Sequence, residues 1–438
     1  MSPGLRSVPK ILRQNIETSI PNCSLAFRPR ATTLLRRVRD QPAHGGGVAT
    51  DNARTTRAMV VVSTALVLAA LPIFLVGGLA VQIRADLGLS ESSFGAAVTA
   101  GFTVGAIAAI FGGRLADRLG PRRVLYAGAT LSMLSLIGLG TVVNSWASLV
   151  FVLGFSGLAV ALTDPGLAIL VGSAITPERQ GLAFGIKEAS IPSATLAAGL
   201  AVPWIALTVG WRWAFAIGVL PVVVLLTLLP GVIRRSRQAN AVELDSSPNV
   251  SLPVRNRTAM LVAGLAGFLG SGAASGVGVF LTESAVAMGF APGDAGLLLA
   301  AGSVAGIFTR IGAGIAADRT GGPQFRLIAW MLAVGSVTIA LGATGTTPLL
   351  VLGTVGAFTG GWAWTGIFFL SLIKTNPSRP GAVAGLGTAS LGLGNAAGPI
   401  VFGTVAEAAS FGTAWLVAGA AAGGGALLMA YARRRFGS

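Results

Sequence analysis

Two long apolar runs of the chain are joined by the stretch GGRLADRLGPRR, residues 112–123, the densest cluster of charge in the sequence. Small residues end the first run, and Asp-Arg, a turn-forming Gly-Pro and more arginines follow. A weaker copy, GAGIAADRTGGPQFR, occupies residues 312–326, starting 200 positions after residue 112. Because both copies lie between apolar runs at matching places, the sequence predicts a duplicated membrane protein.

Composition places this duplication in a lipid bilayer. Of the 438 residues, 53% are hydrophobic and 11% are charged, whereas average soluble proteins are about a quarter charged. A helix needs about 20 apolar residues to cross the hydrocarbon core, and such runs recur from residue 58 onward. The 62 glycines suit helices that pack closely in lipid through small residues. We therefore predict an all-α polytopic membrane protein.

Twelve transmembrane helices are predicted, in two pseudo-symmetric six-helix bundles. The first six spans are 58–83, 93–113, 123–143, 147–173, 181–208 and 212–233, and the second six are 258–283, 293–316, 325–344, 347–373, 381–406 and 412–432. The sequence GIKEAS at residues 185–190 matches GLGTAS at residues 385–390, at the same spacing as the opening motif. The predicted parts are a basic, disordered tail (1–57), a first bundle (58–233), a cytoplasmic linker (234–257) and a second bundle (258–438), with the bundles in parallel orientation.

The net charge of +16 is explained by its location. Basic residues concentrate in alternate connections between spans, and the remaining connections carry little beyond Arg84 and Arg212. This asymmetry follows the rule that cytoplasmic loops are rich in Lys and Arg. It predicts a protein of the cytoplasmic (inner) cell membrane with both termini in the cytoplasm, and a lipid rather than a nucleic-acid partner.

The lone Cys23 and the lone His44 lie before the first span. An intramolecular disulfide and a cysteine-based metal cluster are therefore excluded, and no histidine in the spans can relay protons. We expect neither a metal nor a cofactor. The tail itself, with 10 of the 31 basic residues, has three interpretations: a solvated extension, a transit peptide, or a start assigned too far upstream, with Met59 as the alternative start.

The opening motif resembles the signature of the major facilitator superfamily. That signature is a Gly, small apolar residues, Asp-Arg, Gly and basic residues after the second span, with a degraded copy after the eighth. The resemblance covers roughly residues 58–435. It implies two six-helix bundles around a central cavity lined mainly by spans one, four, seven and ten, with alternating access by rocking.

The resemblance also implies a gating role for the motif. Asp117 would lock the second span against the eleventh near Gly381, and Asp318 would lock the eighth against the fifth near Gly181. The helix dipole favours a carboxylate at a helix N-terminus. The simpler alternative is topological anchoring by the arginines. The candidate gating residues are Gly113, Asp117, Arg118, Gly120, Arg122, Arg123, Asp318 and Arg319.

A finer resemblance concerns the fifth span. Gly185-Ile186-Lys187-Glu188, Pro192 and the sequence GWRWAF at residues 210–215 are similar to bacterial carriers of organic anions, cyanate or nitrate, although many of those have Gln in place of Glu188. The Gly-Pro-x-x-Gly-Gly pattern of drug antiporters is missing from the fifth span. A partial version appears in the eleventh, around Gly398-Pro399.

Charges inside the spans are candidates for function because they are costly in hydrocarbon. Asp164 in the fourth span and Lys187 in the fifth reach similar depth, so we predict that they interact, in a substrate site or as a structural ion pair. Glu188 lies about 100° around the helix from Lys187, so we expect the two to face different surroundings. Asp164 and Glu188 are the carboxylates available to carry protons.

Arg310 lies eight residues before Asp318, about 12 Å deeper in the membrane. A guanidinium there could bind an anionic group of a solute, and the structural alternative is pairing with Glu283 or with a backbone carbonyl. Trp362 and Trp364, in the tenth span, are candidates to wall the cavity against an apolar or aromatic solute, or to pack the core.

These observations predict a secondary transporter for a small, anionic or amphiphilic organic solute, with protons as a candidate coupling ion, acting as a monomer. The alternatives are a multidrug-type proton antiporter and a non-transporting membrane sensor or assembly partner. An enzyme and an ATP-driven pump are disfavoured, because the sequence lacks a catalytic Ser motif and a phosphate-binding Gly-rich loop.

Overall fold

The structure is a computed structural model in which residues 47–174, 179–237, 256–377 and 380–436 are described. Within these ranges the chain is helical and forms no strand. Eleven helices are long and apolar enough to cross a membrane, and a bent pair, Ser63–Gly78 with Ala80–Leu87, raises the number to twelve. The predicted all-α fold of twelve spans is thereby confirmed.

The first half of the chain supplies six spans. They are built from α3 (Gly47–Gly78), α4 (Ala80–Leu87), α5 (Glu91–Thr141), α6 (Trp146–Ala174), α7 (Gln180–Ala201) with the π-helical turn η2 (Val202–Ala206), and α8 (Trp211–Arg237). Helix α5 contains two spans, because Gly120, with φ 78° and ψ 155°, reverses the chain in a conformation that glycine adopts without strain.

The second half repeats the arrangement with one break. Its elements are α9 (Arg257–Ala287), α10 (Pro292–Thr320), α11 (Phe325–Gly342), α12 (Thr347–Gly356), the π-helical turn η3 (Ala357–Gly361), α13 (Thr365–Thr375), α14 (Pro380–Ala408) and α15 (Phe411–Phe436). The tenth span is thus interrupted between Gly356 and Thr365, which the sequence analysis did not predict.

The predicted tail needs correction at its end. Helix α3 begins at Gly47, so residues 47–57 are helical where the sequence was interpreted as disordered. Residues 1–46 lie outside the described ranges, as do residues 238–255 of the predicted linker. The remaining boundaries of the tail, bundles and linker stay predictions.

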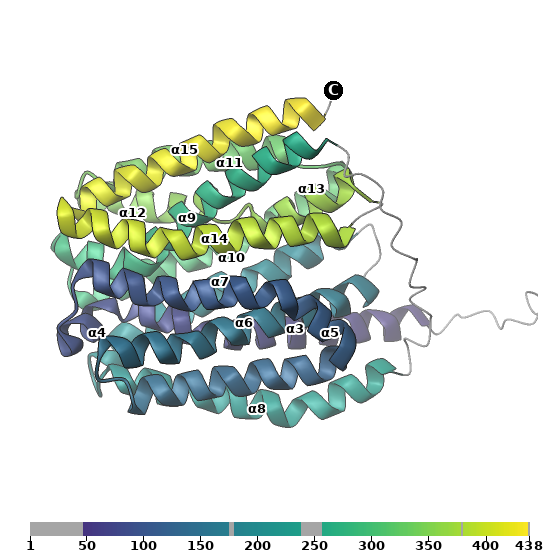
Figure 1. Ribbon diagram of the computed structural model, residues 1–438, viewed down its shortest axis with the longest axis horizontal. Helices are drawn as coiled ribbons and strands as arrows, with labels where there is room; N and C mark the ends of the chain where they lie inside the picture. The colour runs from purple at the N-terminus through teal and green to yellow at the C-terminus, as the bar shows by residue number, and fades with distance from the viewer. Residues whose placement is uncertain (1–46, 175–178, 238–255, 378–379, 437–438) are drawn as a thin grey trace, which may run out of the picture. The chain divides into compact units, whose positions relative to one another are not determined.

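Two helix pairs make the largest contacts between the halves: α7 packs on α10, and α5 packs on α14 (Figure 1). Glycines allow the first pair to approach closely. A Cβ at Gly199 would lie 2.6 Å from the carbonyl oxygen of Gly296, and a Cβ at Gly296 would lie 2.6 Å from that of Gly199. This close approach suits helices that associate in lipid through small residues.

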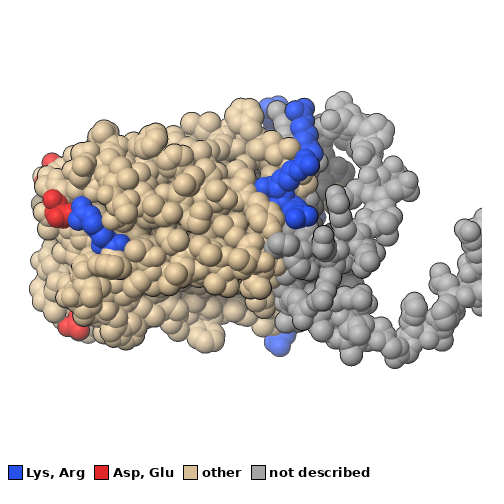
Figure 2. All heavy atoms as spheres, turned by 90° about the horizontal axis from the view of Figure 1, so that it is seen from below, with Lys and Arg blue, Asp and Glu red and all other residues tan. Residues whose placement is uncertain are grey.

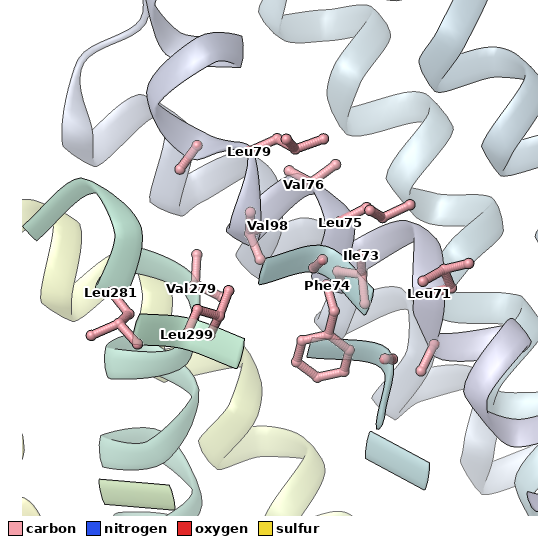
Figure 3. Packing of buried hydrophobic residues seen from close by; sticks show 14 of the residues in the cluster. Leu71, Ile73, Phe74, Leu75, Val76, Leu79, Val98, Val279, Leu281 and Leu299 are labelled. Carbon is pink, nitrogen blue, oxygen red and sulfur yellow. The ribbon is translucent and has the colours of Figure 1, made fainter. Parts of the chain in front are cut away.

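One hydrophobic cluster also runs through both halves. It includes Val76 of α3, Val279 of α9 and Leu299 of α10, which Figure 3 labels. Near these side chains a Cβ at Gly77 would lie 3.2 Å from the Val279 Cα. The two halves therefore share a core rather than meeting only at their ends.

Prolines inside three spans free carbonyl groups that other helices use. A proline lacks the N–H that would bond the carbonyl four residues earlier. Pro72 frees the Leu68 carbonyl, which accepts from Ser132 Oγ at 2.6 Å. Pro399 frees the Asn395 carbonyl, which accepts from Ser275 Oγ at 3.1 Å. The third, Pro192 in α7, frees the carbonyl of Glu188 and belongs to the site described below.

Charged side chains gather at two ends of the helices, and the surface between them carries no charged side chain on the face in Figure 2. We call one end the basic end; it carries Arg118, Arg122, Arg123, Arg319, Arg326 and Arg433 to Arg435. The opposite, acidic end carries Asp86, Glu91, Glu283, Asp294 and Glu407, together with Arg84 and Arg212. A broad apolar belt between two charged ends is the surface expected of a membrane-spanning protein.

Candidate functional site

Asp164 and Lys187 form the ion pair that the sequence predicts. Lys187 Nζ lies 2.6 Å from Asp164 Oδ1 and 3.2 Å from Glu188 Oε1. The Lys187 side chain is 4% exposed, and that of Asp164 is 31% exposed. A buried ammonium is tolerable only when paired in this way. The prediction that Lys187 and Glu188 face different surroundings is wrong, because their long side chains bend toward each other.

Arg310 of α10 is buried against α7. Its Nη1 donates to the backbone carbonyl of Glu188 and lies 3.6 Å from Glu188 Oε2. Its Nη2 donates to the carbonyl of Trp362 at 3.0 Å. Of the two structural alternatives in the sequence analysis, the structure has the backbone carbonyl and not Glu283. Both acceptor carbonyls are free because their helices are interrupted: that of Glu188 by Pro192 in α7, and that of Trp362 by the break in the tenth span.

The broken tenth span completes the group. Thr365 Oγ1 donates to Glu188 Oε2 at 3.0 Å. The ring of Trp362 lies 5.6 Å from the Arg310 guanidinium carbon and 5.8 Å from the ring of Phe74 in α3. Trp364, by contrast, is fully buried in the core of the second half, where its Nε1 donates to the Gly361 carbonyl at 2.7 Å. Trp362 therefore borders the charged group, and Trp364 packs behind it.

We call these residues the central network; it consists of Asp164, Lys187, Glu188, Arg310, Trp362 and Thr365. The first three belong to the first half of the chain and the last three to the second. Glu188 is the joint, because its carboxylate contacts Lys187 on one side and Arg310 and Thr365 on the other. The two acids and the two bases of the central network balance in formal charge. Any separation of the halves at this depth must break the contacts of Glu188 with Arg310 and Thr365.

The degraded copy of the opening motif makes the contact implied for it. Both carboxylate oxygens of Asp318 accept from the start of α7, with Gly181 N at 2.6 Å and Leu182 N at 2.8 Å. The first four N–H groups of a helix lack intrahelical partners, so the carboxylate of one half caps a helix of the other. The predicted contact between Asp318 and the start of the fifth span is confirmed.

The other residues of the motif make no such contact in the described structure. The side chain of Asp117 and the surroundings of Gly113 lie outside its described part, so the expected contact of Asp117 near Gly381 is not addressed. Gly120 forms the turn. The motif arginines are exposed, and Arg122 lies over the ring of Tyr126; these arginines are Arg118, Arg122, Arg123 and Arg319.

The acidic end holds a second set of contacts between the halves. Arg84 of α4 pairs with Glu283 of α9, and its Nη2 lies 3.0 Å from Glu91 Oε1. Glu407 Oε2, at the end of α14, accepts from Ser92 N at 2.8 Å. A pocket of about 410 Å³ adjoins Arg84, Glu91 and Glu283.

These contacts and the role of Thr365 were not predicted from the sequence. The few acidic residues at the ends of predicted spans on the arginine-poor side could have indicated the contacts at the acidic end. Across the described residues no three His, Cys, Asp or Glu side chains are grouped to hold a metal ion. The central network can instead exchange one anionic group for another beside two cations.

The fold has a counterpart among solved structures. The chain is similar to the proton:xylose symporter XylE of the major facilitator superfamily, solved bound to 6-bromo-6-deoxy-D-glucose. The TM-score is 0.67 at 16% sequence identity, over 87% of this chain and 96% of that one. At this identity the likeness shows the fold alone. A comparison with curated proteins finds no match.

A protein-family model described as "Major Facilitator Superfamily" matches residues 62–373. The matched region contains both copies of the opening motif and every residue of the central network. The resemblance drawn from the motif is thereby confirmed, and with it the expectation of a transporter rather than an enzyme. The chain belongs to the major facilitator superfamily of multi-pass membrane transporters.

Proposed function

We propose that the protein is a secondary transporter that moves a small organic anion or amphiphile by alternating access, coupled to protons. The observation that carries this proposal is the Glu188 carboxylate, which is 9% exposed and joins Lys187 of its own half to Arg310 and Thr365 of the other. A buried charge at a joint between moving halves is where proton binding can alter their association.

Charge balance suggests the order of events. Protonation of Glu188 removes the negative charge that Lys187 and Arg310 share. Two cations that lose an anion in a low-dielectric site favour a replacement, and an anionic group of the solute supplies it. Arg310 is suited to this exchange, because its planar guanidinium binds carboxylates in a two-pronged manner. Proton and anion would then move in the same direction.

The two ends supply the gates of this cycle. Asp318 bridges the halves at the basic end, and Arg84 with Glu283 bridges them at the acidic end. Asp117 would act against the eleventh span near Gly381 as Asp318 acts against the fifth. The concentration of arginines at the basic end supports a cytoplasmic location for that end and for both termini, in the cytoplasmic membrane. We propose a monomer as the functional unit.

A multidrug-type proton antiporter is the second candidate. The aromatic group of Phe74, Phe358 and Trp362, with ring centroids 5.8 Å and 5.5 Å from that of Trp362, favours an apolar or aromatic solute beside the carboxylates. In this alternative a cationic drug competes with protons for Asp164 and Glu188, and solute and proton move in opposite directions.

Reconstituted vesicles separate these candidates. We would measure uptake of radiolabelled benzoate and aliphatic carboxylates, and movement of the cation ethidium, with and without a proton gradient. We expect at least one carboxylate to accumulate with the gradient, and Glu188→Gln to abolish the accumulation. Ethidium exchange without carboxylate uptake would replace the proposal with the antiporter. Absence of both fluxes would favour a non-transporting sensor.

A further inference from the structure

Thr365 places a hydroxyl beside Glu188, and the exchange of proton and anion described above gives this hydroxyl no role of its own. It is the first residue of α13, directly after the break in the tenth span, and is 4% exposed. Its Oγ1 donates to Glu188 Oε2 at 3.0 Å, across the boundary between the halves. In a membrane a threonine hydroxyl ordinarily bonds within its own helix.

Other threonines of the protein show that ordinary behaviour. Thr309 Oγ1 donates to the Ala305 carbonyl and Thr359 Oγ1 to the Val355 carbonyl, each at 2.8 Å, and Thr375 Oγ1 donates to the Ser371 carbonyl at 2.7 Å. In each case the acceptor is the carbonyl four residues earlier, the usual partner of a helical hydroxyl. Thr365 departs from this pattern. So do Thr99 and Thr282, which donate to carbonyls of the other half at 2.7 Å and 3.3 Å, but of these three only Thr365 donates to a carboxylate.

Other side chains donate to the two carbonyls nearest to Thr365. The carbonyl four residues before Thr365 is that of Gly361, and it accepts from Trp364 Nε1 at 2.7 Å. The carbonyl three residues before it is that of Trp362, and it accepts from Arg310 Nη2 at 3.0 Å. Both local carbonyls thus serve other side-chain donors, and the Thr365 hydroxyl bonds to the carboxylate.

Each charged group that the described residues place near Glu188 can be assigned to an element. Lys187 lies on the same helix, α7; Asp164 of α6 reaches Lys187; and Arg310 comes from α10. Thr365 of α13 is the neutral member. Its hydroxyl donates to the carboxylate, and such a hydrogen bond is stronger to an ionised acceptor than to a neutral one.

We propose that Thr365 is a positioning residue that favours the ionised form of Glu188, and that Trp364 directs its hydroxyl by occupying the Gly361 carbonyl. Thr365 thereby sets the pH at which the joint between the halves is released. The effect of Thr365 on transport rests on the function proposed above, but its effect on the protonation of Glu188 does not.

Infrared spectroscopy of the purified full-length protein tests the effect without a solute. The carboxylic-acid C=O stretch is followed during a pH titration, and its loss in Glu188→Gln assigns the band. In Thr365→Val we expect the midpoint of this band to move to higher pH by about one unit, the size expected for a hydrogen bond to a charged group. In Thr365→Ser, which keeps the donor, it should stay within a few tenths of a unit.

A second variant tests the role of Trp364 and does not alter Thr365. Trp364→Phe keeps an aromatic ring but frees the Gly361 carbonyl, so the Thr365 hydroxyl can return to its own helix. We expect a shift in the same direction as in Thr365→Val. The two shifts should not add in the double variant, because both substitutions remove the same hydrogen bond between Thr365 and Glu188. Thermal unfolding of each variant controls for loss of structure.

Several results would overturn the proposal: equal midpoints in wild type and Thr365→Val, a Thr365→Ser midpoint shifted like that of the valine variant, or no Glu188 band in any variant down to the pH of unfolding. If Thr365→Val does not fold, the serine and phenylalanine variants decide. Shifted infrared midpoints in a protein that moves no solute would leave this inference standing and contradict the proposed function.

Discussion

Lys187 is buried more completely than any other Lys side chain that the structure describes, and it depends on two carboxylates. Removing one partner of a buried ion pair leaves the other charge uncompensated, which typically costs about 3–5 kcal/mol. We expect Lys187→Met to lose stability near the lower limit of this range, since Asp164 is 31% exposed and can regain water. The fall in the thermal unfolding midpoint of the purified protein measures this loss.

The matched control is the double variant Asp164→Asn/Lys187→Met. It removes both charges of the pair, so we expect it to be more stable than the sum of the two single losses indicates. Additive losses would mean that Asp164 and Lys187 are not coupled, and the ion pair would then contribute nothing to the folded state.

The charged residues of the network could be predicted from sequence because a charge in an apolar run is conspicuous. Asp164 and Lys187 could even be paired, since their distances from a shared loop are similar. A backbone carbonyl could be offered as a partner of Arg310, but the two carbonyls that it bonds could not be named, because only local breaks in other helices make them available. Thr365 could not either, since a hydroxyl in an apolar run normally bonds within its own helix.

At the scale of single helices, α7 owes its role to Pro192. This proline leaves the Glu188 carbonyl without its helical donor, and Arg310 Nη1 takes the place. In Pro192→Ala the new N–H competes for this carbonyl and straightens the helix. We expect transport of the carried anion to fall about tenfold, the effect of ~1.4 kcal/mol, and amide hydrogen exchange in α7 to slow.

Pro399→Ala is the control for this prediction. Pro399 also lies within a span and also frees a carbonyl, but its donor, Ser275, lies in the same half. We expect near-normal transport in this variant. Equal losses in Pro192→Ala and Pro399→Ala would indicate a general need for bent helices and not a specific contact across the halves.

The contact of α7 with α10 at the basic end depends on two glycines. A Cβ at Gly314 would overlap the Gly181 carbonyl, whereas a Cβ at Gly312 would meet nothing within 4 Å. We expect Gly314→Val to separate the helices, break the caps of Asp318 and reduce transport more than tenfold. Gly312→Val should transport normally. Similar activity in both variants would show that close packing here is dispensable.

Helix positions were predictable where hydrophobic length decides them. The end of α10 at Thr320 and the start of α11 at Phe325 lie within a few residues of the predicted limits. The break in the tenth span was not predicted, because its Gly and Trp residues are also compatible with an unbroken apolar helix. The early start of α3 was missed because residues 47–57 are polar.

For the whole molecule, the repeated motif was sufficient to predict two similar halves. It did not indicate how they meet. In the structure, contacts join them at the acidic end through Arg84 and Glu283, at the basic end through Asp318, and between these through Glu188 and Arg310. Such contacts depend on side chains from distant parts of the chain, which a sequence pattern does not place.

The central network lies nearer one end than the other. Glu188 is eight residues from the start of α7 at Gln180, which is about 12 Å along the helix from the basic end. Neutralising Glu188 should therefore loosen the basic end first. The contacts of Arg84 and Glu407 at the acidic end do not involve this carboxylate and should persist.

Distances between spin labels test this claim most directly. In a Cys23→Ser background, labels would be attached at the exposed positions Leu119 and Arg326 at the basic end, and at Val209 and Ala409 at the acidic end. We predict that Glu188→Gln, or acidification of the unmodified network, lengthens the basic-end distance and leaves the acidic-end distance unchanged. Identical basic-end distances with and without the Glu188 charge would contradict the account.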